Sequence, residues 1–219
     1  MRTRVKICCM TTPSDVRAAV IAGADAIGVV GPMPSGPGPV TDEVARTIIA
    51  ATPPGITPVL LSSEPETEGV LRHLQATAAS VLQLVRPVDP AVHRELKAVL
   101  PALKIIQVVH VQGPEAVDLA RGYALTADAL LLDSGHHPDD PVEVLGGAGR
   151  AHDWRLSRNI VSRVDKPVWL AGGLTEANVG DAIGLVRPFG VDLCSAVRTL
   201  GRLDQRKLSG FFQAVRNAS

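Results

Sequence analysis

The sequence predicts a (β/α)8 barrel built as a single domain from residues 1–219. Three observations support this fold. Apolar, strand-like runs recur at a spacing of roughly 20–30 residues, and helix-period segments lie between most of them. Apolar residues make up 46% of the chain and aromatic residues only 3%, a composition that suits a buried parallel sheet. The length of 219 residues fits one such barrel.

Each expected element can be placed in order. Ser14 is the predicted N-cap of a first helix to Ala22, and Thr41 that of a second helix to Ala51. The expected strands are Val5–Cys8, Ala26–Val30, Thr57–Leu61, Ser80–Leu84, Lys104–Val109, Ala127–Leu132, Pro167–Leu170 and Gly190–Leu193. The remaining helices are Glu64–Thr77, Pro90–Leu100, Pro114–Gly122, Trp154–Val164, Thr175–Ile183 and Asp204–Val215. A doubly wound open sheet is the competing fold, although six strands or fewer are more usual there.

Charge and cysteine content narrow the class of protein. The chain has 22 basic and 22 acidic residues, so nothing indicates a nucleic-acid or membrane-surface partner. It has no apolar run of about 18 residues that could span a membrane. Three cysteines, two of them adjacent, make neither a disulfide framework nor a CxxC zinc site. We expect a cytoplasmic protein with reduced thiols that binds a small molecule.

The residues that follow the strands are candidates for chemistry, because barrels place their ligands at the carboxyl ends of their strands. Cys8 ends the first strand, and Asp133 directly follows the apolar run of the sixth. A thiol and a carboxylate on facing strand ends could act as a base and an acid. The alternatives are that Cys8 is a small buried hydrophobe and that Asp133 caps a turn.

A phosphate site is indicated after the last two strands. Gly172-Gly173 follow the seventh strand, and Ser195-Ala196 follow the eighth. Glycine lets backbone N–H groups approach an anion, although these residues could also be ordinary turn glycines. His136 and His137 are adjacent without a third ligand at a defined spacing, so no metal site is predicted.

Several motifs together resemble one family, the phosphoribosylanthranilate isomerases of tryptophan biosynthesis. The motifs are Val5-Lys-Ile-Cys8 with Thr11, Gly23-Ala-Asp-Ala-Ile-Gly28, Gln83-Leu84, Leu132-Asp133, Gly146-Gly-Ala-Gly149 with Asp153-Trp154, Leu170-Ala-Gly-Gly-Leu174 with Asn178-Val179, Gly190-Val-Asp192 with Ser195, and Asp204-Gln-Arg-Lys207 with Phe211-Phe212. They span almost the whole chain in the order of the family. The chain therefore resembles a divergent member.

The resemblance implies a (β/α)8 barrel that performs an Amadori rearrangement without cofactor or metal, as a monomer or homodimer. The residue matching Asp133 would be the general acid that opens the furanose ring, and the residue matching Cys8 the general base at C2′. The phosphate would be held by Gly172, Gly173, Ser195 and Ala196. The resemblance also places Lys6, Gln83, Arg86 and Gly147 among the substrate-binding residues.

The departures from the family pattern concern the aryl end of the substrate. Cys9 stands where the family has Gly, and the loop Ser35-Gly36-Pro37-Gly38 lacks the Arg that pairs with the anthranilate carboxylate. The strand-four motif appears as Gln83-Leu84-Val85-Arg86 and the last motif as Cys194-Ser195-Ala196-Val197-Arg198. Arg86 or Arg198 could replace the lost cation, or both could be solvated side chains.

Three functions remain open from the sequence. The first is a phosphoribosylanthranilate isomerase with a rearranged aryl pocket. The second is a paralogous isomerase that acts on a different phosphoribosyl amine. The third is a barrel that has lost turnover and binds a sugar phosphate or a protein partner, but the presence of both Cys8 and Asp133 counts against it.

Overall fold

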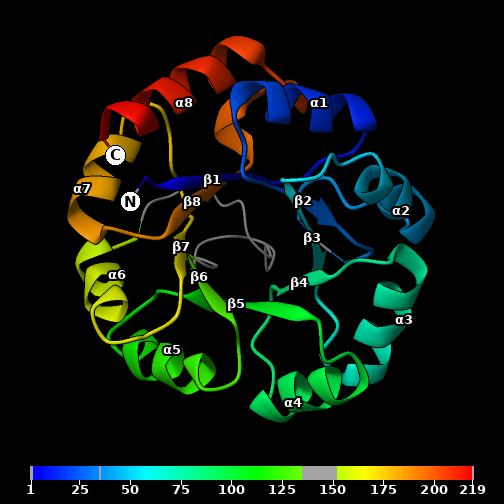
Figure 1. Cartoon of the computed structure of the whole chain (residues 1–219). Helices are drawn as coiled ribbons and strands as arrows, with labels where there is room; N and C mark the ends of the chain where they lie inside the picture. The colour runs from blue at the N-terminus through cyan, green and yellow to red at the C-terminus, as the bar shows by residue number, and fades with distance from the viewer. Residues whose placement is uncertain (1, 35, 135–151, 219) are drawn as a thin grey trace.

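Eight parallel strands close into a barrel surrounded by eight helices (Figure 1) in the computed structural model, which describes residues 2–34, 36–134 and 152–218. The strands are β1 Arg4–Ile7, β2 Ala26–Val30, β3 Thr57–Ser62, β4 Val81–Leu84, β5 Lys104–His110, β6 Ala129–Asp133, β7 Val168–Leu170 and β8 Gly190–Leu193. The helices are α1 Pro13–Ala22, α2 Asp42–Ala50, α3 Thr67–Thr77, α4 Pro90–Val99, α5 Ala116–Ala124, α6 Trp154–Val161, α7 Val179–Val186 and α8 Gln205–Ala218.

The pairing of the first strand with the last decides between the two folds that the sequence allowed. Arg4 of β1 pairs with Gly190 of β8, and the ladder continues to Ile7 opposite Leu193. On its other side β1 pairs with β2. An open doubly wound sheet would leave β1 and β8 apart, so the predicted barrel is confirmed.

Side chains of each strand alternate between two apolar layers. In β6, Leu130 and Leu132 pack in the cluster that joins the strands to the helices, whereas Ala129 and Leu131 belong to the cluster inside the barrel. This alternation puts the next residue, Asp133, on the inner side at the strand's carboxyl end. The interior is thus a packed core, and the cavity described below lies at the carboxyl ends of its strands.

The start of the first helix differs from the expectation. The N-cap of α1 is Thr12 and not Ser14: the Thr12 hydroxyl accepts from the backbone N–H of Asp15, and the Asp15 carboxylate accepts from that of Thr12. Pro13 at the first helical position places Ser14 inside the first turn. The other predicted cap, Thr41 of α2, is confirmed.

Other boundaries shift by a few residues. α3 begins at Thr67 rather than Glu64, and α7 begins at Val179, because residues 174–178 form a loop beside the barrel mouth. After β8 the chain forms a short 3-10 helix, Ser195–Val197, and a two-stranded hairpin, β9 Arg198–Thr199 with β10 Arg202–Leu203, which the sequence analysis did not predict. Within the described ranges no helix combines the length and apolarity needed to cross a membrane.

Candidate active site

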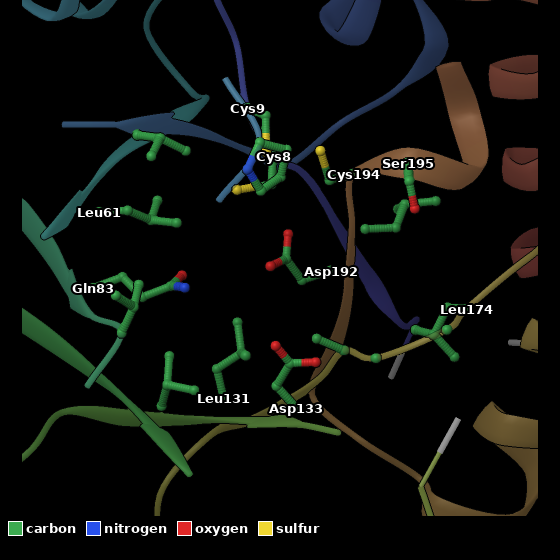
Figure 2. A pocket seen from close by; sticks show the side chains of 18 of the residues that line it. Cys8, Cys9, Leu61, Gln83, Leu131, Asp133, Leu174, Asp192, Cys194 and Ser195 are labelled. Atoms are coloured by element: carbon green, nitrogen blue, oxygen red, sulfur yellow. The ribbon is translucent and has the colours of Figure 1, made fainter. Parts of the chain in front are cut away.

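A cavity of about 260 Å³ opens at the carboxyl end of the barrel (Figure 2). Residues at or just past the strand ends line it. The predicted site residues among them are Cys8, Gln83, Asp133, Gly172, Gly173, Ser195 and Ala196. In Figure 2, Cys8 and Asp133 lie on opposite sides of the cavity, with Asp192 between them. A thiol and a carboxylate therefore face the same space from β1 and β6.

The Cys8 thiol packs closely against β2. The backbone N–H of Cys8 donates to the carbonyl oxygen of Leu193 (2.9 Å) and so continues the ladder with β8. A Cβ atom on Gly28 would lie 2.6 Å from the Cys8 sulfur and 3.2 Å from Lys6 Nζ. Only glycine therefore leaves room for both groups, and the motif glycine at 28 has a steric reason.

Asp133 is fixed at its strand end by a short turn. Its Oδ1 accepts from the backbone N–H of Ser134 (2.8 Å), and the residue is only 6% exposed. Gly172 approaches so closely that a Cβ there would lie 3.0 Å from that oxygen. Within the described ranges, the hydrogen bonds that the Asp133 carboxylate accepts all go to this one oxygen, and the residue lines the cavity.

Lys6 does not line the cavity, so the prediction that it binds substrate receives no support from its position. It points into the barrel below the cavity floor, fully buried, and forms an ion pair with Asp192 (3.0 Å). Burial alone would lower the pKa of Lys6, but the negative charge of Asp192, with smaller contributions from Cys8 and Cys9, raises it above its usual value. Lys6 is thus a buried cation that supports Asp192.

Asp192 lines the cavity, and the sequence analysis did not single it out as a site residue. Burial, with a further contribution from nearby Asp133, raises the pKa of Asp192 against the opposite effect of Lys6. One Asp192 carboxylate oxygen is buried without a hydrogen-bond partner within the described residues. A carboxylate inside the apolar strand Gly190–Leu193 was the available signal, since such a residue needs a partner or a function.

The two glycines after β7 adopt left-handed backbone angles, with φ of 81° at Gly172 and 63° at Gly173. Asn178 braces this turn: its side-chain amide donates to the carbonyl of Gly173, and its side-chain oxygen accepts from the backbone N–H of Thr175. Ser195 and Ala196 face the same part of the cavity from the 3-10 helix after β8. Residues that follow two neighbouring strands, β7 and β8, thus line one cavity, and turns of this kind are where barrels commonly bind an anion.

Gln83 projects from β4 into the cavity. Its side-chain oxygen is buried and makes no hydrogen bond to the part of the chain that the structure describes. A buried amide oxygen without a hydrogen-bond partner costs free energy, so a donor group on a ligand is its natural partner.

Neither arginine proposed as a replacement cation lines the cavity. The Arg198 guanidinium donates to the carbonyl oxygens of Cys8, Cys9 and Gly201 and so ties β1 to the hairpin. Arg86 follows β4 with its side chain outside the lining, and its carbonyl accepts from Gln107. The predicted role of Arg86 in substrate binding has no structural support.

Two further thiols lie beside Cys8 (Figure 2). Cys9 has a φ of 64°, a left-handed angle that explains why glycine is the usual residue there. A hydrogen bond from Cys9, helped by the Arg198 guanidinium, lowers the pKa of Cys194 to about 7 against the effect of burial. The same hydrogen bond, together with burial, raises the pKa of Cys9, so Cys194 is the more acidic thiol of this pair.

Some predicted residues lie outside the described ranges: Ser35, His136, His137 and Gly147. Within the described ranges, no three His, Cys, Asp or Glu side chains are placed to hold a metal ion together.

Known proteins resemble this chain over nearly its whole length. A family model for N-(5′-phosphoribosyl)anthranilate isomerase matches residues 5–214. The isomerase of Halobacterium salinarum is 40% identical over 213 residues, which cover 95% of this chain and 94% of that protein. The isomerase of Methanocella arvoryzae is 37% identical over 216 residues and 98% of each chain.

Solved structures agree. The phosphoribosylanthranilate isomerase of Thermotoga maritima superposes with a TM-score of 0.84 at 28% identity and covers 98% of this chain and 99% of that one. The Thermus thermophilus enzyme gives 0.83 at 28% identity and covers 99% and 100%. A further structure, with a TM-score of 0.81, 27% identity and coverage of 98% and 99%, is a complex with reduced 1-(o-carboxyphenylamino)-1-deoxyribulose 5-phosphate.

Proposed function

Since the chain belongs to the N-(5′-phosphoribosyl)anthranilate isomerase family, we propose that its barrel mouth performs the family's Amadori rearrangement with Asp133 as the acid and Cys8 as the base. The protein is an isomerase of tryptophan biosynthesis that converts an N-(5-phosphoribosyl) arylamine to the 1-deoxyribulose 5-phosphate. The observation that carries the assignment of residues is the placement of Cys8 and Asp133 on opposite sides of one cavity.

The first step opens the sugar. Asp133, protonated, donates its proton to the furanose ring oxygen, and the bond between that oxygen and C1′ breaks as the amine nitrogen forms an imine. Asp133 suits this role because the Ser134 N–H and the close approach of Gly172 hold its carboxyl group in one orientation. The acid is thus positioned before the substrate arrives.

The second step moves a proton from C2′. Cys8, as the thiolate, accepts this proton and leaves an enaminol, which tautomerises to the ketone. The Cys8 sulfur packs against Gly28 of β2, which has no side chain to displace it, and it lies across the cavity from Asp133. Acid and base therefore act from opposite sides of the sugar.

The phosphate belongs at the corner formed by Gly172, Gly173, Ser195 and Ala196. Gly172 and Gly173 adopt left-handed backbone angles, and a turn with successive residues of this kind can direct backbone N–H groups toward an anion. This corner lies at the ends of β7 and β8, where barrels commonly bind phosphate.

The test is a fluorescence assay in which phosphoribosylanthranilate is made in situ and its conversion by the purified protein is followed. Asp133→Asn should abolish turnover while the fold is preserved, and Cys8→Ser should reduce kcat by at least about 100-fold, the usual contribution of a general base. Cys9→Gly is the matched control: glycine suits the φ of 64° there, so turnover should persist. Full activity of Asp133→Asn would refute the acid assignment, and a crippled Cys9→Gly with active Cys8→Ser would show that the base is the other thiol.

We also propose that the protein works in the cytoplasm as a monomer or homodimer; light scattering on the purified chain will measure its mass.

A further inference from the structure

The cavity lacks an obvious partner for the carboxylate of an aryl substrate. Among the described lining residues none is a Lys or Arg, and Asp133 and Asp192 are acidic. An aromatic carboxylate that left water without meeting a positive group would bind poorly. Arg198 is engaged by three backbone carbonyls, and Arg86 lies outside the lining.

Among the described lining residues, His110 is the one whose side chain can gain a positive charge and so pair with a ligand carboxylate. It is the last residue of β5 and lies between Val85, which follows β4, and Asp133 of β6, its partner in register. The apolar side chains of Leu61, Val108 and Leu131 line the same cavity and provide a surface for an aromatic ring.

The hydrogen bonding of His110 leaves one ring nitrogen available. Its Nε2 lies 3.2 Å from the carbonyl oxygen of Val85, which can only accept, so Nε2 carries a hydrogen. Its Nδ1 is buried and has no hydrogen-bond partner among the described residues. The hydrogen bond of Nε2 fixes the orientation of the imidazole ring, and the buried Nδ1 is left available to bind a ligand.

We propose that His110 is the specificity-determining residue for the aryl carboxylate: with Nε2–H bound to Val85, it binds the carboxylate through a protonated Nδ1. His110 thereby replaces the arginine that the loop at residues 36–38 lacks. This inference rests on the proposed function, because it concerns the aryl group of that substrate. The proposal also explains why the chain has the expected acid, base and phosphate-binding residues but lacks the expected arginine for the aryl carboxylate.

Other groups around His110 fit this role. On β4 the Gln83 amide is neutral, and on β6 Asp133 donates its proton to the sugar. Beyond them, Asp192 is paired with Lys6. A ligand carboxylate therefore brings the negative charge that makes protonation of Nδ1 favourable, and binding at alkaline pH must take up a proton.

The experiment compares two ligands by calorimetry: reduced 1-(o-carboxyphenylamino)-1-deoxyribulose 5-phosphate and the same compound without its carboxyl group. The wild-type protein should bind the carboxylated ligand at least about tenfold more tightly, the usual effect of a charge-assisted hydrogen bond. In His110→Gln the two affinities should become nearly equal, while the affinity for the ligand without the carboxyl group stays unchanged. His73→Gln, which changes a histidine that contacts Asp42 and Glu64 on the outside of the barrel, should keep the wild-type ratio.

A second measurement needs no variant. At pH 8, where a free imidazole is neutral, the wild-type protein should take up about one more proton with the carboxylated ligand than with the other, seen as a dependence of the binding enthalpy on the buffer. An unchanged affinity ratio in His110→Gln, an equal loss for both ligands, or no extra proton uptake would overturn the role of His110. A wild-type protein that binds neither ligand and turns over no substrate would refute the proposed function itself, and the inference with it.

Discussion

At the scale of single residues, the site depends on small side chains that allow close approach. Gly28 leaves room for the Cys8 sulfur and Lys6, and Gly172 leaves room for the Asp133 carboxylate. Neither requirement can be read from the residues themselves, because each concerns atoms that are distant in sequence. The Cys8 thiol and the Asp133 carboxylate are therefore both positioned by the absence of a side chain on a neighbouring segment, Gly28 within β2 and Gly172 just past β7.

Gly172→Ala tests this positioning. Its φ of 81° and a Cβ only 2.8 Å from the Ser134 nitrogen make alanine strained, at a cost of about 1–2 kcal/mol in the free energy of unfolding. The new methyl group also displaces Asp133, so kcat should fall by roughly tenfold or more. Steady-state kinetics and urea unfolding measure the two effects. Gly122→Ala is the control, since a Cβ within α5 meets nothing and should slightly stabilise the protein without affecting kcat.

At the scale of elements, α1 begins where Thr12 and Asp15 cap each other. Thr12→Ala should therefore lower the free energy of unfolding by about 1 kcal/mol. Ser14→Ala should have little effect, because Ser14 lies within the first turn and makes no capping bond. Urea unfolding of the two variants side by side measures the difference, and an equal loss in both would contradict the observed cap.

The packing of α4 on β5 predicts a loss of stability in acid. His93 of α4 is fully buried between Gln107 and Thr126, and burial lowers its pKa. The unfolded chain therefore binds a proton more readily than the folded one below the ordinary histidine pKa of 6.5. The stability is complete above that pH and declines as the pH falls below it.

The variant His93→Gln removes this titration. Its free energy of unfolding should be lower at neutral pH, since two buried hydrogen bonds change, but it should fall less between pH 7.5 and 5.5 than that of the wild type. Urea midpoints at several pH values measure this slope. Parallel curves for the two proteins would show that His93 does not control acid stability, leaving His152, whose pKa burial also lowers, as the next histidine to test.

At the scale of the whole molecule, the barrel is closed by contacts between the last elements of the chain and the first. β8 pairs with β1, and α8 packs against both α1 and α7 (Figure 1). The aromatic side chains of Phe211 and Phe212 on α8 are both buried, and the Phe212 ring lies 3.7 Å from where a Cβ on Gly23, at the end of α1, would stand. The ends of the chain are thus joined through one core.

Phe211→Ala should lower the free energy of unfolding by about 3–5 kcal/mol, because it leaves a cavity in that seam. Unfolding should remain a single transition when followed by both far-ultraviolet dichroism and tryptophan fluorescence. Ile21→Ala, on an exposed position of α1, should change the stability by no more than about 0.5 kcal/mol. Separate transitions for the two probes would indicate that the barrel unfolds in parts.

The sequence by itself determined the alternation of elements and the strand ends that carry chemistry. Cys8, Asp133, Gln83 and the glycines at 172 and 173 all line the cavity, because hydrophobic periodicity is local and a barrel collects its strand ends at one mouth. The tertiary structure decided what depends on contacts across the barrel: the closure of β1 on β8, the ion pair of buried Lys6 with Asp192, the hydrogen bonds from Arg198 to backbone carbonyls, and the position of His110. These contacts join residues up to 190 positions apart in the sequence, so no local pattern predicts them.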